Sequence, residues 1–316
     1  MKKIAIIADL RGWIFERHAK EIQKRLSHKF DISIGYIRGT NLPKLYQDKD
    51  LVYMMSPMIK QYPDRHKTII GLRSEWPYKN HTRGARGLYE EGLKRSFVSI
   101  KDKCDLFHVV NENQYKEFMG VATDKLVMIV QHGVNTSCFS RDKYTRSNKT
   151  NHLVVGVSGR DGSPNKKGFE IVKRVCVDHN VEFVSSHYGH GRLSMEEMPQ
   201  FYNKIDVYVC MSETEGLCNP IMEAGAMGIP VISTRSGAAE EMIQDNENGL
   251  LINRDRISLG EALEKMKDVK LRKLFGDAFY DEIVSNWSWD VKIKEYEDMF
   301  DLFLNIKESG CESKRY

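Results

Sequence analysis

The sequence predicts an α/β fold of two Rossmann-like domains facing across a cleft. The first observation is that short apolar runs alternate with stretches of helical periodicity, which is typical of parallel sheets covered by helices. The second is that this rhythm occurs twice, in series separated by the polar segment SRDKYTRSNKTN at residues 140–151, which we interpret as a linker. The third is length, because 316 residues suffice for two domains.

The first series predicts an N-terminal domain spanning residues 1–148. Its opening run, KIAIIA, is continuous in apolar residues, which is typical of a strand buried on both faces. A helix with apolar positions at helical spacing follows at about residues 14–27. The other expected strands are ISIGYI, LVYMMS, TIIGLR, LFHVV and KLVMIV, and the other expected helices span about residues 84–100 and 112–119.

The second series begins at HLVVGVSGR and predicts a C-terminal domain spanning residues 149–289. A helix from about residue 168, the strand VEFVSS and the helix MEEMPQFYNKI lead to an apolar run that ends at Met211. PVIST and GLLI are the next expected strands. Two amphipathic helices follow at about 258–267 and 270–286, and the last segment, WSWDVKIKEYEDMFDLFLNI, also has helical periodicity.

The composition favours a cytoplasmic protein. No apolar run approaches the ~20 residues that a membrane-spanning helix needs, and the opening MKKIAIIADL is too short and too strand-like for a signal peptide. The six cysteines show neither a C-x-x-C pair nor a regular spacing. The sequence therefore indicates neither a zinc site nor a disulfide framework.

The net charge of +4 is distributed unevenly along the chain. Residues 1–150 contain 28 Lys and Arg against 16 Asp and Glu, a net charge of +12, and the remaining residues carry a net charge of −8. A chain divided in this way often meets an anionic partner with its basic part. Scattered, solvated lysines are the alternative interpretation of the same count.

Residues 212–225, SETEGLCNPIMEAG, carry the strongest chemical pattern. They follow a buried strand, and Pro220 and Gly228 are placed to begin and to stop a helix. A strand, a short loop and a helix N-terminus in this order bind negative charge, because the loop and first turn have unpaired N–H groups. Glu215 and Glu223 bracket the turn, and a carboxylate is a good acceptor for vicinal sugar hydroxyls. These features together predict a site for a nucleotide sugar.

This stretch resembles the E-x7-E motif of family-4 retaining glycosyltransferases, which have the GT-B fold. The resemblance extends from Tyr202 to Ile252 and includes Gly216, the GIPVIST strand and the G-x-x-E turn that follows it. A plain strand–helix unit with two solvated glutamates is the alternative. The resemblance implies that the two domains are those of a GT-B enzyme, and that a terminal helix at about residues 290–316 crosses back onto the first domain.

The resemblance also implies roles for individual residues. Arg160 and Lys167 would hold the pyrophosphate, as in the family pattern G-R-x-x-x-x-K-G, and Lys166 is an alternative to Lys167 because the loop is longer here. Glu223 would hold the ribose hydroxyls and Glu215 those of the donor sugar, so that Arg160, Lys167 and Glu215 are the predicted catalytic residues. The other predicted donor contacts are Gly12 of the first domain and Gly159, Gly216, Leu217 and Cys218 of the second.

Two fixed cations can stabilise a departing diphosphate without a metal ion, so we expect no cofactor and no metal requirement. Asp48 and Asp50 form a D-x-D pattern, but they precede a strand and are interpreted as solvated loop acids. The family often has a histidine after a first-domain strand, and the segment TIIGLRSEWPY has none. Arg73 and Glu75 are therefore the candidate contacts on the acceptor side.

These observations predict a glycosyltransferase that moves a hexosyl or pentosyl group from a nucleotide-diphosphate sugar to a hydroxyl of an anionic acceptor, with retention of configuration. The first hypothesis for the acceptor is an envelope glycan or a lipid-linked molecule at the inner membrane surface. The second is a hydroxymethylated base of phage-like DNA. A GT-B nucleotide-sugar epimerase or phosphorylase is the alternative from another class of enzyme.

Overall fold

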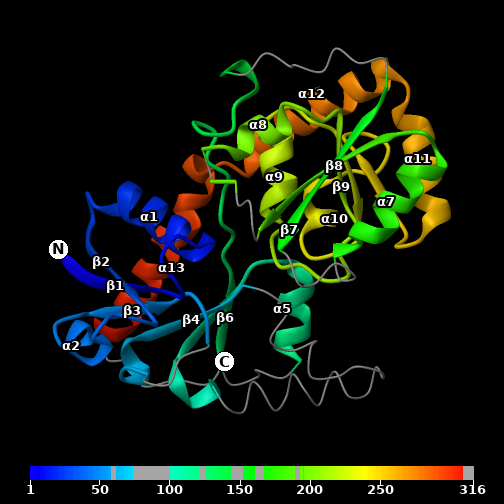
Figure 1. The fold of residues 1–316 in the computed structure, drawn as a ribbon. Helices are drawn as coiled ribbons and strands as arrows, with labels where there is room; N and C mark the ends of the chain where they lie inside the picture. Colours follow the sequence, from blue (N-terminus) through cyan, green and yellow to red (C-terminus); the bar gives the residue numbers. More distant parts are fainter. Residues whose placement is uncertain are drawn as a thin grey trace. The chain divides into compact units, whose positions relative to one another are not determined.

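The computed structural model divides the chain into two compact units (Figure 1). Unit 1 comprises Met1–His132 and Lys292–Tyr316, and unit 2 comprises Gly133–Val291. The structure describes residues 1–57, 62–73, 100–120, 125–143, 152–160, 167–188, 193–194 and 196–308. The helix predicted at about residues 84–100 lies outside these residues. Both units consist of a parallel sheet with alternating helices, which confirms the predicted α/β fold of two Rossmann-like domains.

Unit 1 is built on a six-stranded sheet with the order β2-β1-β3-β4-β5-β6. The strands are β1 (Lys2–Ala8), β2 (Phe30–Tyr36), β3 (Leu51–Met54), β4 (Thr68–Leu72), β5 (Leu106–Val109) and β6 (Leu126–Ile129). The described helices are α1 (Ile14–Leu26), α2 (Leu42–Tyr46), α5 (Glu112–Met119) and α13 (Trp289–Glu308), with 3-10 turns at Arg65–Lys67 and Lys101–Lys103. Every pairing is parallel, so the carboxyl ends of all six strands meet at one edge of the sheet.

The strands of unit 1 form where the sequence is continuously apolar. All residues of β3 and β4 are buried, and so is β1 from Ile4 onward. Continuous apolar runs belong to strands that are covered on both faces, which explains why no period of two is visible in them. The core on one side of this sheet includes Val52, Ile70 and Phe107, and Phe118 of α5 packs against it.

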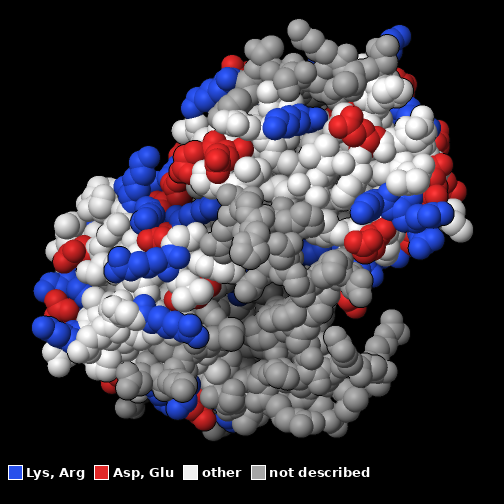
Figure 2. Space-filling model, viewed as in Figure 1, with Lys and Arg blue, Asp and Glu red and all other residues white. Residues whose placement is uncertain are grey.

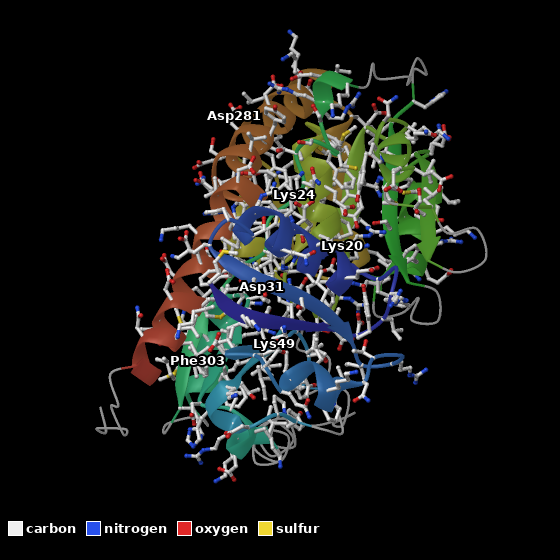
Figure 3. All side chains as sticks on the ribbon, turned by 90° about the vertical axis from the view of Figure 1, so that its left-hand side faces the viewer. Lys20, Lys24, Asp31, Lys49, Asp281 and Phe303 are labelled. Carbon is white, nitrogen blue, oxygen red and sulfur yellow. The ribbon has the colours of Figure 1, made fainter. Side chains whose placement is uncertain are left out.

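Helix α13 packs onto unit 1, although it lies at the opposite end of the sequence. Phe300 lies edge-on to Phe30 of β2, with ring centroids 5.9 Å apart, and to Tyr53 of β3 at 5.8 Å. At the edge of this contact Lys29 donates a hydrogen bond of 2.7 Å to Glu297. Figure 3 shows the side chains of this part of the molecule, with Phe303 of α13 labelled. The expected return of the terminal helix to the first domain is therefore found in the structure.

Unit 2 is built on a five-stranded parallel sheet with the order β11-β10-β9-β7-β8. Its strands are β7 (Val154–Arg160), β8 (Glu182–Tyr188), β9 (Val207–Cys210), β10 (Val231–Thr234) and β11 (Leu250–Ile252). Its helices are α7 (Phe169–Asp178), α8 (Met198–Tyr202), α9 (Asn219–Ala226), α10 (Ala239–Met242), α11 (Arg256–Met266) and α12 (Val269–Asn286), with a 3-10 turn at Arg141–Lys143. Helix α8 is shorter than the helix predicted from MEEMPQFYNKI.

The boundary between the units lies earlier than predicted. We expected the first domain to end at residue 148, whereas unit 2 begins at Gly133. Val134 forms a parallel bridge with Ser288, and its backbone N–H donates to the carbonyl of Trp287 at 2.8 Å. Farther along, Arg141 lies over the ring of Tyr280 at 3.6 Å. Contacts with residues about 150 positions away decide this boundary, whereas composition pointed only to the polar segment after it.

Surface charge in unit 1 is mixed on the face shown in Figure 2. Lys and Arg side chains are frequent there, and Asp and Glu side chains lie among them. Some exposed acids of unit 1 pair with bases, for example Asp48 with Lys3 at 3.1 Å. Exposed pairs of this kind contribute little to stability, although they reduce the field that a distant anion would experience.

No helix among the described residues combines the length and the apolar character that crossing a membrane would require.

Candidate functional site

The candidate site in unit 2 lies at the carboxyl edge of its sheet, where the strand order changes direction. Along the chain, β7 is followed by β8 on one side and then by β9 on the other. Ligands of open parallel sheets bind outside the carboxyl ends of strands at such a switch point. The loop after β7 contains the predicted cation Lys167, and the loop after β9 contains the first glutamate of the predicted motif.

Lys167 and Glu215 meet at this edge. The ammonium group of Lys167 forms an ion pair with Oε1 of Glu215, and the Ser212 hydroxyl donates to the same oxygen at 2.7 Å. The side chains of Lys167 and Glu215 are 30% and 14% exposed, so the pair is only partly open to solvent. Burial would lower the pKa of Lys167, but the nearby Glu215 carboxylate outweighs it and raises that pKa above its ordinary value. Lys167 therefore remains a cation throughout the physiological range.

Two glycines allow the backbone approaches that fix this pair. Gly168 has a φ of +71°, and a Cβ there would lie 2.5 Å from the Cβ of Met211. Gly237 has a φ of +58°, and a Cβ there would lie 2.3 Å from the carbonyl oxygen of Gly216. Only glycine combines this left-handed conformation with such close contact. The loops after β7, β9 and β10 are consequently packed backbone to backbone.

Hydrogen bonds from neighbouring elements hold the loop after β9 in place. The Thr234 hydroxyl, at the end of β10, donates to the carbonyl of Ser212 at 2.7 Å. The Arg254 Nε donates to the carbonyl of Met211 at 2.9 Å, and the Ala238 N–H donates to that of Gly216 at 3.0 Å. Residues 211–216 therefore have little freedom to move independently of the sheet.

Glu223 lies on the second turn of α9 and is buried, with 6% of the residue exposed. The hydroxyl of Tyr202 donates to its Oε2 at 2.7 Å. Pro220 lies in the first turn of α9, and Gly228 follows the helix with a φ of +67°, so both ends form as the sequence predicted. Buried carboxylates are costly unless they are paired, and the Tyr202 hydroxyl is one partner of this carboxylate.

Two buried thiols lie at the two ends of the loop after β9, and no cysteine pattern in the sequence predicted their proximity. The Sγ atoms of Cys210, the last residue of β9, and Cys218, the N-cap of α9, are 3.7 Å apart. Their hydrogen bond lowers the pKa of Cys210 to about 7 and, together with burial, raises the pKa of Cys218. Their C-x7-C spacing matches no common cysteine motif, so only the fold reveals their proximity.

Other predicted donor contacts lie around the same edge. Gly159 is next to the end of β7, and a Cβ there would touch the ring of Phe169 at 3.0 Å. Leu217 is buried at the start of the turn into α9. Arg160 ends β7, where its backbone is in register with Tyr188; its side chain and the whole of Lys166 lie outside the described residues.

Gly12 of unit 1, the predicted donor contact from the first domain, lies in the turn before α1. Its backbone N–H donates to Oε2 of Glu16 at 2.5 Å, so this amide is already engaged within the protein. Glu16 also accepts a hydrogen bond of 2.6 Å from the Tyr36 hydroxyl. This bond and the Gly12 amide outweigh burial and lower the pKa of Glu16 to about 2. The turn before α1 thus bonds to a buried carboxylate, and a donor contact by Gly12 stays a prediction.

Unit 1 contains a buried cluster of one arginine and two histidines, of which only the arginine was predicted as a site residue. Arg73, after β4, donates through Nη2 to Nδ1 of His18 at 2.6 Å and to Nδ1 of His132 at 2.8 Å. The two imidazoles are 4.0 Å apart between centroids. A guanidinium can only donate, so both Nδ1 atoms accept and are unprotonated. Glu75, the other predicted acceptor contact, lies outside the described residues.

The Nε and Nη1 atoms of Arg73 are buried and form no hydrogen bond within the described part of the chain. Arg73 also lies 5.1 Å from the ring centroid of Phe15. Sequence reasoning found Arg73 as a polar residue after a strand. It missed His18 and His132, because they come from a helix and a loop far away in sequence.

Part of this chain matches the sequence model of a known protein family. Residues 141–268 match the sequence model of the family described as Glycosyl transferases group 1. This segment of the chain is similar to the group 1 glycosyltransferases. The matched segment contains the ends of β7 and β9, the whole of α9, and hence the Lys167–Glu215 pair and Glu223. The resemblance inferred from the E-x7-E stretch is thereby confirmed.

Curated relatives resemble this group 1 segment. The capsular polysaccharide biosynthesis glycosyltransferase CapM of Staphylococcus aureus is 30% identical over 110 residues, which cover 34% of this chain and 29% of that protein. A GDP-mannose-dependent phosphatidylinositol monomannoside mannosyltransferase of Mycobacterium tuberculosis is 30% identical over 118 residues, covering 34% and 30%. The matches span about a third of the length of these relatives.

Solved structures share the fold over almost the whole chain. HepE from Anabaena, solved in complex with UDP and glucose, has a TM-score of 0.73 at 12% identity and covers 95% of this chain and 100% of its own. The sucrose-phosphate synthase of Thermosynechococcus elongatus has a TM-score of 0.70 at 14% identity, covering 96% and 100%. The fold is therefore the GT-B fold.

The substitution Gly168→Ala tests how tightly the loops of the group 1 segment are packed. Alanine at this position would have to adopt the left-handed backbone conformation, and its Cβ would collide with Met211. We therefore expect the free energy of unfolding to fall by about 3 kcal/mol. Gly39→Ala is the matched control, because Gly39 has a φ of +84° with no atom within 4 Å of a Cβ. This control substitution should lower the free energy of unfolding by about 1 kcal/mol. If urea denaturation gave the same loss of unfolding free energy for Gly168→Ala and Gly39→Ala, the contact with Met211 would be unimportant.

Proposed function

We propose that this protein is a retaining glycosyltransferase that moves a sugar from a nucleotide-diphosphate sugar to a hydroxyl of an anionic acceptor. The observation that carries the proposal is the placement of Lys167, Glu215 and Glu223 around the β9–α9 turn of the group 1 segment. One cation, two carboxylates and a helix N-terminus offer a partner for each polar part of a sugar diphosphate.

The donor roles follow from what each group can bind. Lys167, and Arg160 at the end of β7, would hold the diphosphate, whose charge grows as it leaves. Glu223, already holding one hydroxyl from Tyr202, would accept hydrogen bonds from the ribose. Glu215 would accept from the hydroxyls of the donor sugar once Lys167 turns to the phosphate. HepE, which has the same fold, binds UDP and glucose, and this supports a nucleotide sugar as the donor.

The proposed reaction breaks the bond between the anomeric carbon and the diphosphate oxygen and forms a bond to the acceptor oxygen on the same face. The acceptor's proton passes to the leaving diphosphate. Glu215 is held by Lys167 and Ser212 through Oε1, which suits a carboxylate that positions hydroxyls. Fixed cations at the diphosphate would supply most of the rate enhancement, because they stabilise charge that develops only as the bond breaks.

The proposed acceptor is an envelope glycan or a lipid-linked molecule with a negative group. Arg73 supports this choice, because its guanidinium is 94% buried and, among the described residues, its Nε and Nη1 atoms form no hydrogen bond. A phosphate or carboxylate of the acceptor would accept hydrogen bonds from them. The relatives named for capsular polysaccharide and for a phosphatidylinositol mannoside act on envelope molecules, which favours this class.

Lys167→Ala and Glu223→Gln test the donor site. We expect Lys167→Ala to lower kcat about 100-fold or more, because it removes charge that stabilises the leaving group. Glu223→Gln should mainly weaken binding of the nucleotide, about tenfold, because it removes the charge from a hydrogen-bond acceptor. Release of the nucleoside diphosphate and calorimetric binding would be measured across UDP, GDP and ADP sugars.

Lys173→Ala is the matched control for these variants, because Lys173 is an exposed lysine on α7. It should behave like the parent protein. Transfer at a near-parental rate by Lys167→Ala would refute the donor assignment. Interconversion of a nucleotide sugar without any acceptor would indicate an epimerase instead.

Arg73→Met tests the acceptor site separately. We expect it to raise KM for an anionic acceptor by about tenfold or more while leaving KM for the donor unchanged, because only the acceptor's charge loses its partner. The natural control is a neutral analogue of the same acceptor, for which parent and variant should differ little. An equal loss with charged and neutral acceptors would mean that Arg73 has a structural role.

A further inference from the structure

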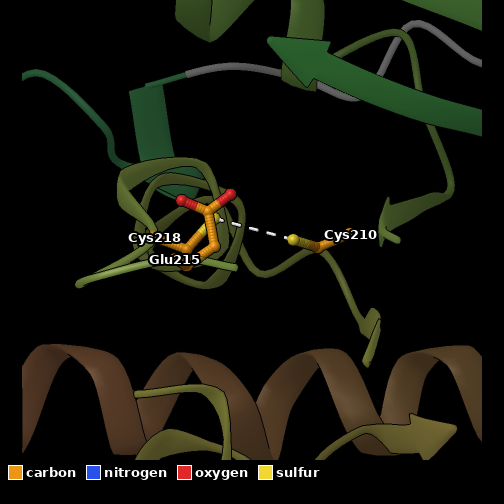
Figure 4. A group of neighbouring side chains, drawn as sticks. All are labelled: Cys210, Glu215 and Cys218. Atoms are coloured by element: carbon orange, nitrogen blue, oxygen red, sulfur yellow. Dashed lines mark hydrogen bonds between the residues drawn. The ribbon is translucent and has the colours of Figure 1, made fainter. Parts of the chain in front are cut away.

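Cys210, Cys218 and Glu215 form a compact group of potential metal ligands beside the donor loop. One ligand atom from each lies within 4.8 Å of the other two. Figure 4 draws the three side chains, with the dashed line joining the two sulfur atoms, which are 3.7 Å apart. Cys210 comes from the end of a strand and Cys218 from the cap of a helix, so the sheet fixes their separation.

The separation of the sulfurs matches a metal-bound pair. Two thiolates bound to one tetrahedral zinc ion at ~2.3 Å lie about 3.8 Å apart. A disulfide would require the same atoms at ~2.05 Å. The observed 3.7 Å therefore needs almost no change to accept a zinc-like ion between the sulfurs, whereas a disulfide needs both ends of the loop to move.

Glu215 provides the third ligand. Its Oε1 holds the bonds from Lys167 and Ser212, and within the described residues no hydrogen bond involves Oε2. Oε2 is therefore available to a cation while Oε1 remains anchored. The fourth position of a tetrahedral ion would be open, as it is in sites that exchange water for a ligand.

The charge of the site is compatible with a divalent ion. With both thiols protonated, the Glu215 carboxylate and the Lys167 ammonium cancel. A divalent ion that displaces the two thiol protons adds two positive charges and creates two thiolates, so the buried group stays neutral overall. Binding therefore requires no uncompensated buried charge, which is the usual obstacle to an ion inside a protein.

We propose that Cys210, Cys218 and Glu215 bind a thiophilic divalent cation, of which Zn²⁺ is the physiological example, and that this ion and the nucleotide sugar compete. The competition rests on the proposed function, in which Glu215 and Lys167 hold the donor. A bound ion would draw Glu215 onto the thiolates and place positive charge next to Lys167, so the ion and the donor weaken each other's binding equally. The metal would regulate transfer rather than take part in it.

The test uses the full chain, reduced with a phosphine, and Cd²⁺ as the probe in the absence of nucleotide. Cadmium bound to thiolates absorbs in the ultraviolet, so a titration reports both affinity and ligand type. We expect one ion per chain, a dissociation constant of about 1 µM or lower, and the release of protons from the thiols in calorimetry across buffers. Cys210→Ser and Cys218→Ser should each weaken binding at least 100-fold.

Cys104→Ser and Cys176→Ser are matched controls, because each removes a buried thiol outside the group. They should bind Cd²⁺ like the parent. If a serine variant of the group fails to fold, protection of Cys210 and Cys218 from alkylation in the Cd²⁺-loaded parent gives the same information by mass spectrometry. The proposal would be overturned if the control variants lost as much Cd²⁺ affinity as the Cys210 and Cys218 variants, or if Cd²⁺ gave no protection from alkylation. A dissociation constant above about 100 µM would also overturn it and leave the thiols as core residues.

The competition is measured afterwards, by repeating the titration with saturating nucleotide sugar. We expect the apparent affinity for Cd²⁺ to fall at least tenfold. Cadmium binding that a bound donor leaves unchanged would overturn the regulatory part. A protein that binds Cd²⁺ at this group but binds no nucleotide sugar would instead refute the proposed function and leave the metal site standing.

Discussion

The ion pair between Lys167 and Glu215 is the interaction on which the proposed donor site depends. Its partners belong to loops that follow β7 and β9, the two strands that flank the switch point of the second sheet. Two glycines hold these loops in addition to the ion pair. Gly168 allows close contact with Met211, and Gly237, after β10, allows close contact with Gly216 in the loop after β9. A parallel sheet thus fixes a cation and a carboxylate at one edge, and we propose that they bind the phosphate and the hydroxyls of one ligand.

The two units differ in the partners of their buried cations. In unit 2 the cation has a carboxylate partner, and that partner holds its pKa high. In unit 1 the buried Arg73 has two neutral imidazoles and, among the described residues, no carboxylate within ion-pair distance. A buried cation costs stability unless an anion neutralises it, and this is the basis on which we propose that Arg73 meets an anionic group of the acceptor. This local arrangement is a stronger argument for an anionic acceptor than the net charge of the first half of the sequence.

Sequence reasoning worked where the signal is local. Continuous apolar runs predicted the strands, and the spacing of Glu215 and Glu223 with Pro220 and Gly228 predicted a helix whose N-terminus faces a loop. It was inaccurate where contacts distant in sequence decide the outcome. The first domain ends before residue 148 because Val134 pairs with Ser288, 154 positions farther along the chain. The thiols of Cys210 and Cys218 meet only because a strand end and a helix cap are adjacent in space.

A crystal structure of the protein with an intact nucleotide-diphosphate sugar tests the central claim most directly. The account predicts that the diphosphate contacts Lys167 and the N-terminal turn of α9, that the ribose hydroxyls bond to Glu223, and that Glu215 exchanges Lys167 for hydroxyls of the sugar. A nucleotide bound away from the carboxyl edge of the second sheet, or one bound there while the Lys167–Glu215 pair stays intact, would contradict it.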